Sequence, residues 1–252
     1  MGTMKLFAFA LTALLLTGNS IETQAPLPSW TQWGGPTRDF MVPSTGLATT
    51  WPSGGPRRLW SRPLGEGHSA ILFENGRIYT HYRPLSTPRS QEEVVIAMDA
   101  GSGSTLWEYR YPSPTTGADF SEGAGPHATP LIVGSRLFAV GARRDFIALD
   151  KTTGKLLWSH DLIKEYNAPG IDRGMANSPL LHNNTILLPI GGGGQAIGAF
   201  HPETGALLWK AGRVTESPAS PIIIDGDGQK QLVVFGGERI AAGHDPSNGN
   251  EL

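Results

Sequence analysis

Residues 148–158 read Ala148-Leu149-Asp150-Lys151-Thr152-Thr153-Gly154-Lys155-Leu156-Leu157-Trp158. Apolar residues flank a short polar segment, which is typical of two strands joined by a tight turn. Asp150 suits such a turn because its carboxylate can accept backbone N–H groups just ahead of it. Gly154 suits it because glycine adopts a positive φ at little steric cost. The stretch therefore predicts a hairpin.

The same spacing recurs along the chain. The copies are Ala97, Asp99, Gly103 and Trp107, then Ala199, Thr204, Gly205 and Trp209, and an incomplete one with Gly243, Asp245 and Gly249. The complete copies place tryptophans at 107, 158 and 209, a period of 51 residues, and Trp60 stands 47 residues before the first of them. A fixed period of this size, with strand and turn content and no helical pattern, indicates a propeller or a β-solenoid.

Each repeat reads as four short antiparallel strands. The expected strands are 68–72, 77–79, 94–99 and 105–109, then 129–133, 136–140, 146–150 and 156–160, then 178–181, 185–189, 196–200 and 207–210, and finally 220–224, 231–235 and 239–243. Asn75-Gly76 between two apolar runs is a strong hairpin signal. We expect an all-β fold, a propeller of four-stranded antiparallel blades with about four blades present. Residues 57–61 predict one more strand, which would help to close the ring.

Composition excludes several kinds of protein. The 252 residues include 33 glycines and 20 prolines, yet apolar residues punctuate them at strand spacing, so the excess indicates turns and not disorder. The net charge of −2 does not indicate a nucleic-acid partner or an anionic membrane surface. The chain contains no cysteine, which excludes disulfides, thiolate metal sites and cysteine nucleophiles.

The N-terminal 25 residues resemble a secretory signal peptide. Lys5 precedes an apolar run over 6–16 that is too short to span a bilayer, and we expect cleavage after Ala25. Residues 16–18 are similar to the start of a lipoprotein box, but Asn19 stands where the lipidated cysteine would be. We expect a periplasmic or secreted protein that neither spans the membrane nor carries a lipid anchor. A buried N-terminal helix is the alternative.

Residues 26–56 are rich in tryptophan, proline and glycine. Such a segment forms turns and extended pieces whose aromatic rings cover apolar surface. We expect a clasp packed across the blades, ahead of the propeller repeats in 57–252. An aromatic ligand-binding box is the alternative.

The pattern Ala-x-Asp-x-x-Thr-Gly-x-x-x-Trp, complete over 148–158, resembles the tryptophan-docking repeat of pyrroloquinoline-quinone (PQQ) propellers. The pairs Thr129-Pro130, Ser178-Pro179 and Ser220-Pro221 that open the blades also fit this family. The departures are Ser102 and Asn248 in place of threonine and His201 in place of aspartate. The resemblance covers about 30–252. It implies that Trp60, Trp107, Trp158 and Trp209 dock neighbouring blades together.

Propellers of this family close with seven or eight blades, so the resemblance implies that the chain is the N-terminal part of a larger ring. The fourth copy stops one residue before its expected tryptophan, at Leu252. We therefore expect a C-terminally truncated propeller. A closed four-bladed ring is the alternative.

The family contains quinoprotein dehydrogenases and non-catalytic relatives that are similar to the assembly lipoprotein BamB. Its dehydrogenases hold the quinone on the propeller axis, near two adjacent cysteines, with a carboxylate base beside Ca²⁺. No such cysteine pair exists here, and no motif assigns a catalytic residue. We expect a non-catalytic binding or scaffold module with a protein or peptide partner and no cofactor. A PQQ- and Ca²⁺-dependent oxidoreductase for an alcohol or a sugar stays open, as does a polysaccharide or peptide binder that uses the N-terminal tryptophans.

Polar residues where blades begin are the candidate ligand-binding residues, because these loops line one mouth of a propeller channel. They are His68, His127, Arg173, Asn177 and Glu216, with Glu66 and Ser220 beside them. Histidine and arginine facing a funnel could bind an anionic ligand or a peptide; ordinary loop residues are the alternative.

No metal site is expected. The histidines at 81, 160, 182, 201 and 244 share no offset, and we expect them on the surface. Residues 225–228 resemble a calcium loop but lack a distal glutamate, and we interpret them as a hairpin turn. The glycines at 191–194 resemble a phosphate cradle but lead into no helix, so we expect a flexible hairpin there.

Overall fold

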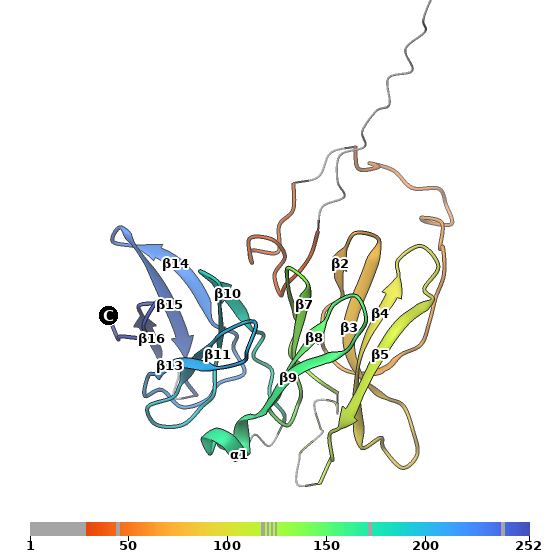
Figure 1. The fold of residues 1–252 in the computed structure, drawn as a ribbon. Coiled ribbons are helices and arrows are strands. Elements are labelled where there is room, and N and C mark those ends of the chain that lie inside the picture. The colour runs from red at the N-terminus through yellow and green to blue at the C-terminus, as the bar shows by residue number, and fades with distance from the viewer. Residues whose placement is uncertain are drawn as a thin grey trace, which may run out of the picture.

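The computed structural model describes residues 29–43, 46–116, 119, 121, 123, 125–170, 173–237 and 240–252. These residues form four antiparallel sheets, one for each sequence repeat (Figure 1). The expected signal peptide, 1–25, lies outside the described residues. No helix in the described part of the chain has the length and apolar character needed to cross a bilayer.

Strands that follow one another in the chain lie side by side in each sheet. The first sheet holds β2 (Leu72–Glu74), β3 (Arg77–Pro84), β4 (Glu92–Asp99) and β5 (Thr105–Pro112), with β1 (Gly65–Glu66) also paired to β3. The second holds β6 (Leu131–Val133), β7 (Arg136–Val140), β8 (Asp145–Asp150) and β9 (Leu156–Asp161), and the third holds β10 (Leu180–His182), β11 (Thr185–Leu188), β12 (Ile197–Phe200) and β13 (Leu207–Ala211). The fourth holds β14 (Ile222–Gly226), β15 (Gln229–Phe235) and β16 (Ala241–His244). Short connections and antiparallel order make each sheet a propeller blade, as the sequence predicts.

The four blades converge at the starts of their first strands. Two residues before each first strand, a backbone N–H donates to the next blade: Ala70 to the Thr129 hydroxyl at 3.0 Å, Thr129 to the Ser178 hydroxyl at 2.9 Å, and Ser178 to the Ser220 hydroxyl at 2.9 Å. These successive hydrogen bonds from backbone N–H to hydroxyl place the first strand of each blade near a common axis and the last strand farther from it. It also gives a structural reason for the Thr-Pro and Ser-Pro pairs.

The turn in the repeat is held by the side chain at its aspartate position. Asp150 Oδ1 accepts from the backbone N–H groups of Thr152 at 3.0 Å and Thr153 at 2.8 Å, and from the Thr153 hydroxyl at 2.8 Å. These hydrogen bonds, chiefly those from Thr153, lower the pKa of Asp150. His201 replaces the aspartate in the third blade, and its Nδ1 accepts from the N–H groups of Glu203 and Thr204. The departure from the motif therefore leaves the turn intact.

Each repeat tryptophan packs on the turn glycine of the next blade. The Trp158 ring covers Gly205, and its indole N–H donates to the Pro202 carbonyl at 3.1 Å. The same arrangement joins Trp107 to Gly154. Trp60 covers Gly103, and Trp209 covers Gly249. Glycine is required here for two reasons. Gly205 has φ +74°, which favours glycine, and a Cβ there would lie 2.8 Å from the Trp158 ring.

The alanine of the motif also has a packing role. Ala148 lies opposite Trp158 and is fully buried, and a bulge follows it between Ala148 and Leu149. The same register shift follows Ala97 and Ala199. A bulge increases the local twist of a strand. The small residue and the bulge together set the position from which each tryptophan reaches the next blade.

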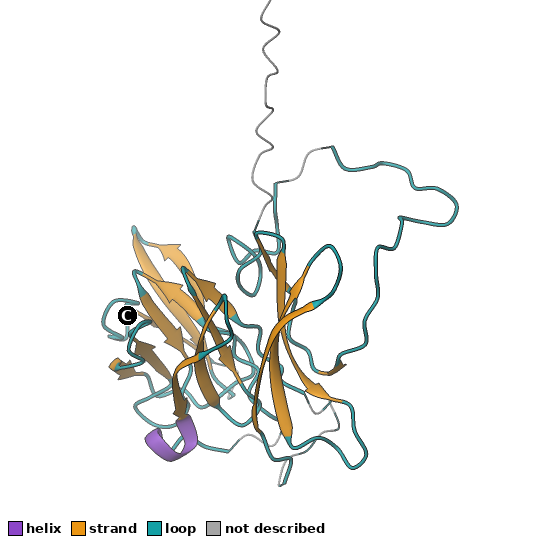
Figure 2. Ribbon diagram, turned by 45° about the vertical axis from the view of Figure 1, so that its right-hand side comes forward, coloured by secondary structure: helices purple, strands orange, loops and turns teal. Residues whose placement is uncertain are grey.

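Apolar clusters fill the space between neighbouring blades. Between the second and third blades, Phe146 packs edge-on against Trp158, with ring centroids 5.1 Å apart, and against Phe200 at 5.2 Å. Other clusters lie between the first and second blades and between the third and fourth. Figures 1 and 2 show the sheets standing side by side in chain order.

Some sequence expectations were wrong in detail. Residues 57–61 form no strand, although Trp60 still docks. The first strands begin at 72, 131, 180 and 222, later than expected, because the residues before them bond to the neighbouring blade. A single turn of helix, α1 (Leu162–Tyr166), follows β9 and is capped by the Asp161 carboxylate, which accepts from the Lys164 N–H. Five residues are too few to show a helical period.

Candidate functional site

Three of the predicted site residues meet where the blades begin. The Nδ1 atoms of His68 and His127 lie 2.7 Å apart, and their rings stack at 4.9 Å with 15° between planes. One Nδ1 must donate while the other accepts, so the pair shares a proton. Burial, and then the proximity of His68, lowers the pKa of His127, and a hydrogen bond with the Arg173 backbone opposes this. This end of the axis is therefore polar: the two Nδ1 atoms pair with each other, while His127 Nε2 is buried without a hydrogen-bond partner among the described residues.

Asn177 instead ties two loops together. Its side chain is buried and donates to the carbonyls of Ser217 at 2.8 Å and Ala219 at 2.7 Å. Ser220 accepts from the Ser178 N–H. The Asn177 amide nitrogen and the Ser220 hydroxyl oxygen both serve the connection between the third and fourth blades.

Glu216 lies close enough to Arg144 to stabilise its charge, while burial lowers the pKa of Arg144. Arg144 is buried, has φ +66° and donates to the Ile190 carbonyl. Within the described part of the chain, its Nε and one terminal nitrogen have no hydrogen-bond partner. A Cβ on Gly191 would lie 3.2 Å from the guanidinium, so this glycine makes room for Arg144. No motif or spacing in the sequence indicated this buried cation.

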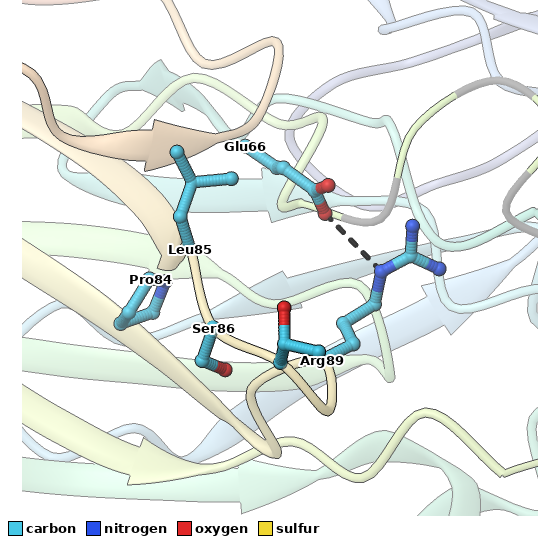
Figure 3. A pocket seen from close by; sticks show the side chains of 6 residues that line it. Glu66, Pro84, Leu85, Ser86 and Arg89 are labelled. Carbon is cyan, nitrogen blue, oxygen red and sulfur yellow. Dashed lines mark ion pairs between the residues drawn. The ribbon is translucent and has the colours of Figure 1, made fainter.

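Glu66 lines a separate small pocket under the first blade. The pocket has a volume of about 210 Å³ and is formed with the loop between β3 and β4. Figure 3 shows the Glu66 carboxylate facing Arg89 across it, with a Glu66 Oε2 to Arg89 Nε distance of 3.4 Å. Glu66 therefore forms an ion pair in this pocket, away from the histidine pair, although it stands only two residues before His68 in the sequence.

A buried ionic cluster on the first blade reaches the second blade through the Ala142 N–H, which donates to the Glu93 carboxylate, and the sequence did not predict it. Glu93 accepts from Arg83 at 2.9 Å, from the Tyr111 hydroxyl at 2.6 Å and from the Ser113 hydroxyl at 3.0 Å. Burial raises the pKa of Glu93, against the opposing effect of Tyr111 first and then Arg83. The cluster also contains His81, whose Nε2 lies 3.0 Å from the Tyr111 hydroxyl.

Two histidines expected on the surface are buried. His81 is 1 % exposed, and burial, followed by the charge of Arg83, lowers its pKa to about 3. His244 is fully buried, and its Nδ1 lies 3.0 Å from the Gly249 carbonyl. Both positions lie on strands between blades, where an imidazole fills space and still finds a polar partner.

A cavity of about 500 Å³ opens beside the ionic cluster. Its lining residues are Pro112, Pro114, Arg143, Asp145, Asp161, Ile163 and Lys164. Burial raises the pKa of Asp145 to about 7, with smaller contributions from Glu93 and Asp161. Asp161 pairs with Lys164 at 2.7 Å.

The N-terminal segment, residues 29–43, crosses the first strands of all four blades. Trp30 exchanges two backbone hydrogen bonds with Phe73, of 2.7 and 2.9 Å, and the Ile132 N–H donates to the Thr31 carbonyl at 2.8 Å. Figure 2 shows the segment as a hook above the place where the sheets converge. The segment therefore adds its own backbone to the axial edges of the first two blades.

Arg38 extends these contacts to the other two blades. Its guanidinium donates to the Pro179 carbonyl at 3.2 Å and the Pro221 carbonyl at 3.1 Å, just ahead of β10 and β14. It also donates to the Gln32 side-chain oxygen at 3.3 Å and lies 5.3 Å from the Trp33 ring centroid. Burial lowers the pKa of Arg38 to about 10.

A groove of about 390 Å³ lies between this segment and the third and fourth blades. It is lined by Gln32, Pro36, Thr37, Arg38, Leu180, Leu181, His182, Ile222, Ile223 and Lys230. Its floor is the apolar side of two first strands, and its rim is cationic.

Several of the blade-start side chains bond within the protein itself. His68 and His127 bond to each other, and the Asn177 amide and the Ser220 hydroxyl bond to backbone groups. Over the described ranges, no three histidine, aspartate or glutamate side chains are placed to hold a metal ion together.

Comparison with known proteins gives one family and two kinds of relative. The family model described as outer membrane protein assembly factor BamB matches residues 91–252. Quinohemoprotein alcohol dehydrogenase ADH IIB of Pseudomonas putida is 30% identical over 153 residues, which are 60% of this chain and 21% of the relative. BamB of Shewanella oneidensis is 33% identical over 93 residues, 37% of this chain and 22% of the relative. The chain thus spans about a fifth of the length of these relatives.

Solved structures include matches of both kinds. BamB from Moraxella catarrhalis has a TM-score of 0.48 at 17% identity, covering 72% of this chain and 46% of that one. A europium-containing methanol dehydrogenase has a TM-score of 0.49 at 16% identity, covering 72% of this chain and 40% of that one.

Proposed function

Because the chain belongs to the family of PQQ-repeat propellers described as outer membrane protein assembly factor BamB, we propose that it is a non-catalytic binding or scaffold module. The proposal includes export to the periplasm or beyond the cell, directed by residues 1–25. It also includes a protein or peptide partner, as the name of the assembly-factor relative suggests.

The observation that carries the proposal is the course of the N-terminal segment. Trp30 and Thr31 bond to the axial edges of the first and second blades, and Arg38 bonds to the third and fourth. The segment therefore contacts the first two blades through its backbone and the other two through the Arg38 side chain. Blades joined in this way form a rigid frame, and such a frame suits the presentation of binding surfaces.

The second candidate is a PQQ-dependent oxidoreductase acting on an alcohol or a sugar. The match to quinohemoprotein alcohol dehydrogenase, at 30% identity over 60% of this chain, favours it. Within the proposal, His68, His127 and Arg173 are the residues nearest to a ligand at the blade starts.

One assay separates the two candidates. The full-length protein is incubated with PQQ and Ca²⁺, and dye reduction with primary alcohols and aldose sugars is measured beside the absorption spectrum. A known quinoprotein dehydrogenase, reconstituted in parallel, shows that the assay works. We expect no dye reduction above the protein-free control and no protein-bound quinone spectrum. PQQ-dependent dye reduction that is lost in His127→Phe would contradict the scaffold proposal.

A further inference from the structure

One residue in the first strand of each of the first three blades occupies an equivalent position, but only two of the three bond to the described residues of the N-terminal segment. Phe73, Ile132 and Leu181 each stand two positions before a two-residue turn, in β2, β6 and β10. They face Ile78, Leu137 and Ile186 of the neighbouring strands. The three residues therefore occupy one structural position in three successive blades.

The backbone at this position points away from its own blade. In an antiparallel pair, residues alternate between bonding to the partner strand and pointing their N–H and C=O outward. Phe73 and Ile132 show the outward direction directly, because Phe73 bonds to Trp30 and Ile132 bonds to Thr31. The same register places the N–H and C=O of Leu181 on the axial edge of the third blade.

Leu181 lacks the cover that the first two blades have. Its backbone makes no hydrogen bond beyond β11 to any residue that the structure describes. The Leu181 side chain is 37% exposed, whereas Ile132 is 5% exposed. Leu181 and its neighbours instead line the groove of about 390 Å³. An unpaired edge that borders a groove with both polar and apolar lining residues is a template for one more strand.

The charge of the groove selects the side chains of such a strand. Arg38 is held by neutral acceptors, namely two carbonyls and the Gln32 amide oxygen, and by the Trp33 ring. Its Nε has no hydrogen-bond partner among the residues that the structure describes. Lys230 is already paired with Asp225 at 2.8 Å. Of these two cations, Arg38 is therefore the one without an acidic partner among the described residues. A carboxylate is the group that pairs best with its guanidinium.

We propose that this groove binds an extended peptide segment that carries an acidic side chain. The peptide pairs its backbone with Leu181, as Trp30 and Thr31 pair with the first two blades, and places its carboxylate at Arg38. Apolar side chains of the peptide pack on Leu181 and Ile222, which line the groove and are not buried. This inference rests on the proposed binding function and names the kind of partner for it.

The first test measures peptide binding by fluorescence anisotropy. The probe is a labelled, end-blocked nonapeptide of alternating threonine and valine with one central aspartate, mixed with the full-length protein. We expect saturable binding that weakens about tenfold or more with Arg38→Gln or with lysine in place of the aspartate. A probe N-methylated along one edge should not bind. Equal binding of the aspartate and lysine probes would overturn the charge argument, and equal binding of the N-methylated probe would overturn the strand pairing.

The second test places the peptide in the groove by covalent trapping. The chain has no cysteine, so Leu181→Cys and the control Leu208→Cys each introduce a unique thiol. Leu208 is 52% exposed and lies on the outer strand β13. The thiolate displaces thionitrobenzoate from an activated cysteine in the peptide, and the released thionitrobenzoate is read by its absorbance. We expect release about tenfold faster with Leu181→Cys, since bound peptide raises the local concentration.

Several outcomes of the trapping test would overturn the proposal. Equal rates for the two variants would show that the peptide does not sit beside Leu181. Crosslinking of Leu181→Cys to itself in a dimer, with no peptide bound, would assign the groove to a second copy of the chain. The quinone assay is independent of these readouts, so failure of this inference is distinguishable from failure of the proposed function.

Discussion

Trp158→Ala is expected to lower the free energy of unfolding by about 3–5 kcal/mol. The indole covers Gly205 of the next blade and donates to the Pro202 carbonyl at 3.1 Å. Its ring also packs edge-on against Phe146 at 5.1 Å. Alanine removes the contact, the hydrogen bond and the filling of the space between blades. Denaturant titration followed by circular dichroism measures the loss.

Two matched changes control this prediction. Trp51 is 62% exposed, so Trp51→Ala should change stability by about 0.5 kcal/mol or less. Gly205 and Gly134 both have positive φ, but only at Gly205 would a Cβ meet a ring. Gly205→Ala should therefore destabilise more than Gly134→Ala. Equal losses for Trp158→Ala and Trp51→Ala would contradict docking between blades.

Glu93→Gln is expected to destabilise the protein by about 3 kcal/mol, because it removes the charge of a buried carboxylate that pairs with a buried arginine. Arg83 and Glu93 are both fully buried and lie 2.9 Å apart. The amide cannot compensate the guanidinium, and its N–H₂ group replaces one of the two oxygens that accept from the Tyr111 and Ser113 hydroxyls. Thermal and denaturant unfolding both measure the effect.

The adjacent residue supplies the control for this prediction. The Glu92 side chain is 52% exposed and lies 3.7 Å from Arg110. An exposed ion pair of this kind contributes about 0–1 kcal/mol, so Glu92→Gln should leave the unfolding curve almost unchanged. An unchanged free energy of unfolding for both Glu93→Gln and Glu92→Gln would show that the ionic cluster does not hold the first two blades together.

The repeats, the turns and the docking tryptophans can be read from the sequence because each depends on local spacing. Asp150 bonds within its own turn, and the interval from Trp107 to Gly154 equals that from Trp158 to Gly205. A contact that recurs at nearly fixed spacing leaves a periodic signal. The fold class and the blade order follow from that signal.

Features built from single, non-repeating contacts left no such signal. Arg38 reaches Pro179 and Pro221, which are 141 and 183 residues away in the chain. The ionic cluster depends on Glu93 and His81 lying on paired strands at a blade interface. Charged residues within an apolar run were the only local sign in the sequence that such a cluster could form. The partners of each group come from distant segments, so sequence spacing cannot supply them.

The blade-start residues show the same limit. The sequence placed His68, His127 and Arg173 at one mouth, and the structure brings them together. The sequence did not indicate that the two histidines would bond to each other, or that the Asn177 side chain would donate to backbone carbonyls. Equivalent positions can be inferred from repeats, but the pairing of their side chains depends on rotamers and loop paths.

Amide hydrogen exchange at three equivalent residues tests the central claim, that the N-terminal segment pairs with the axial edges of the first two blades. The Phe73 and Ile132 amides donate to Trp30 and Thr31, while the Leu181 amide has no such partner among the described residues. In the peptide-free, full-length protein we predict that Leu181 exchanges on the order of 100-fold faster than Phe73 and Ile132. Equal exchange at all three amides would contradict the claim.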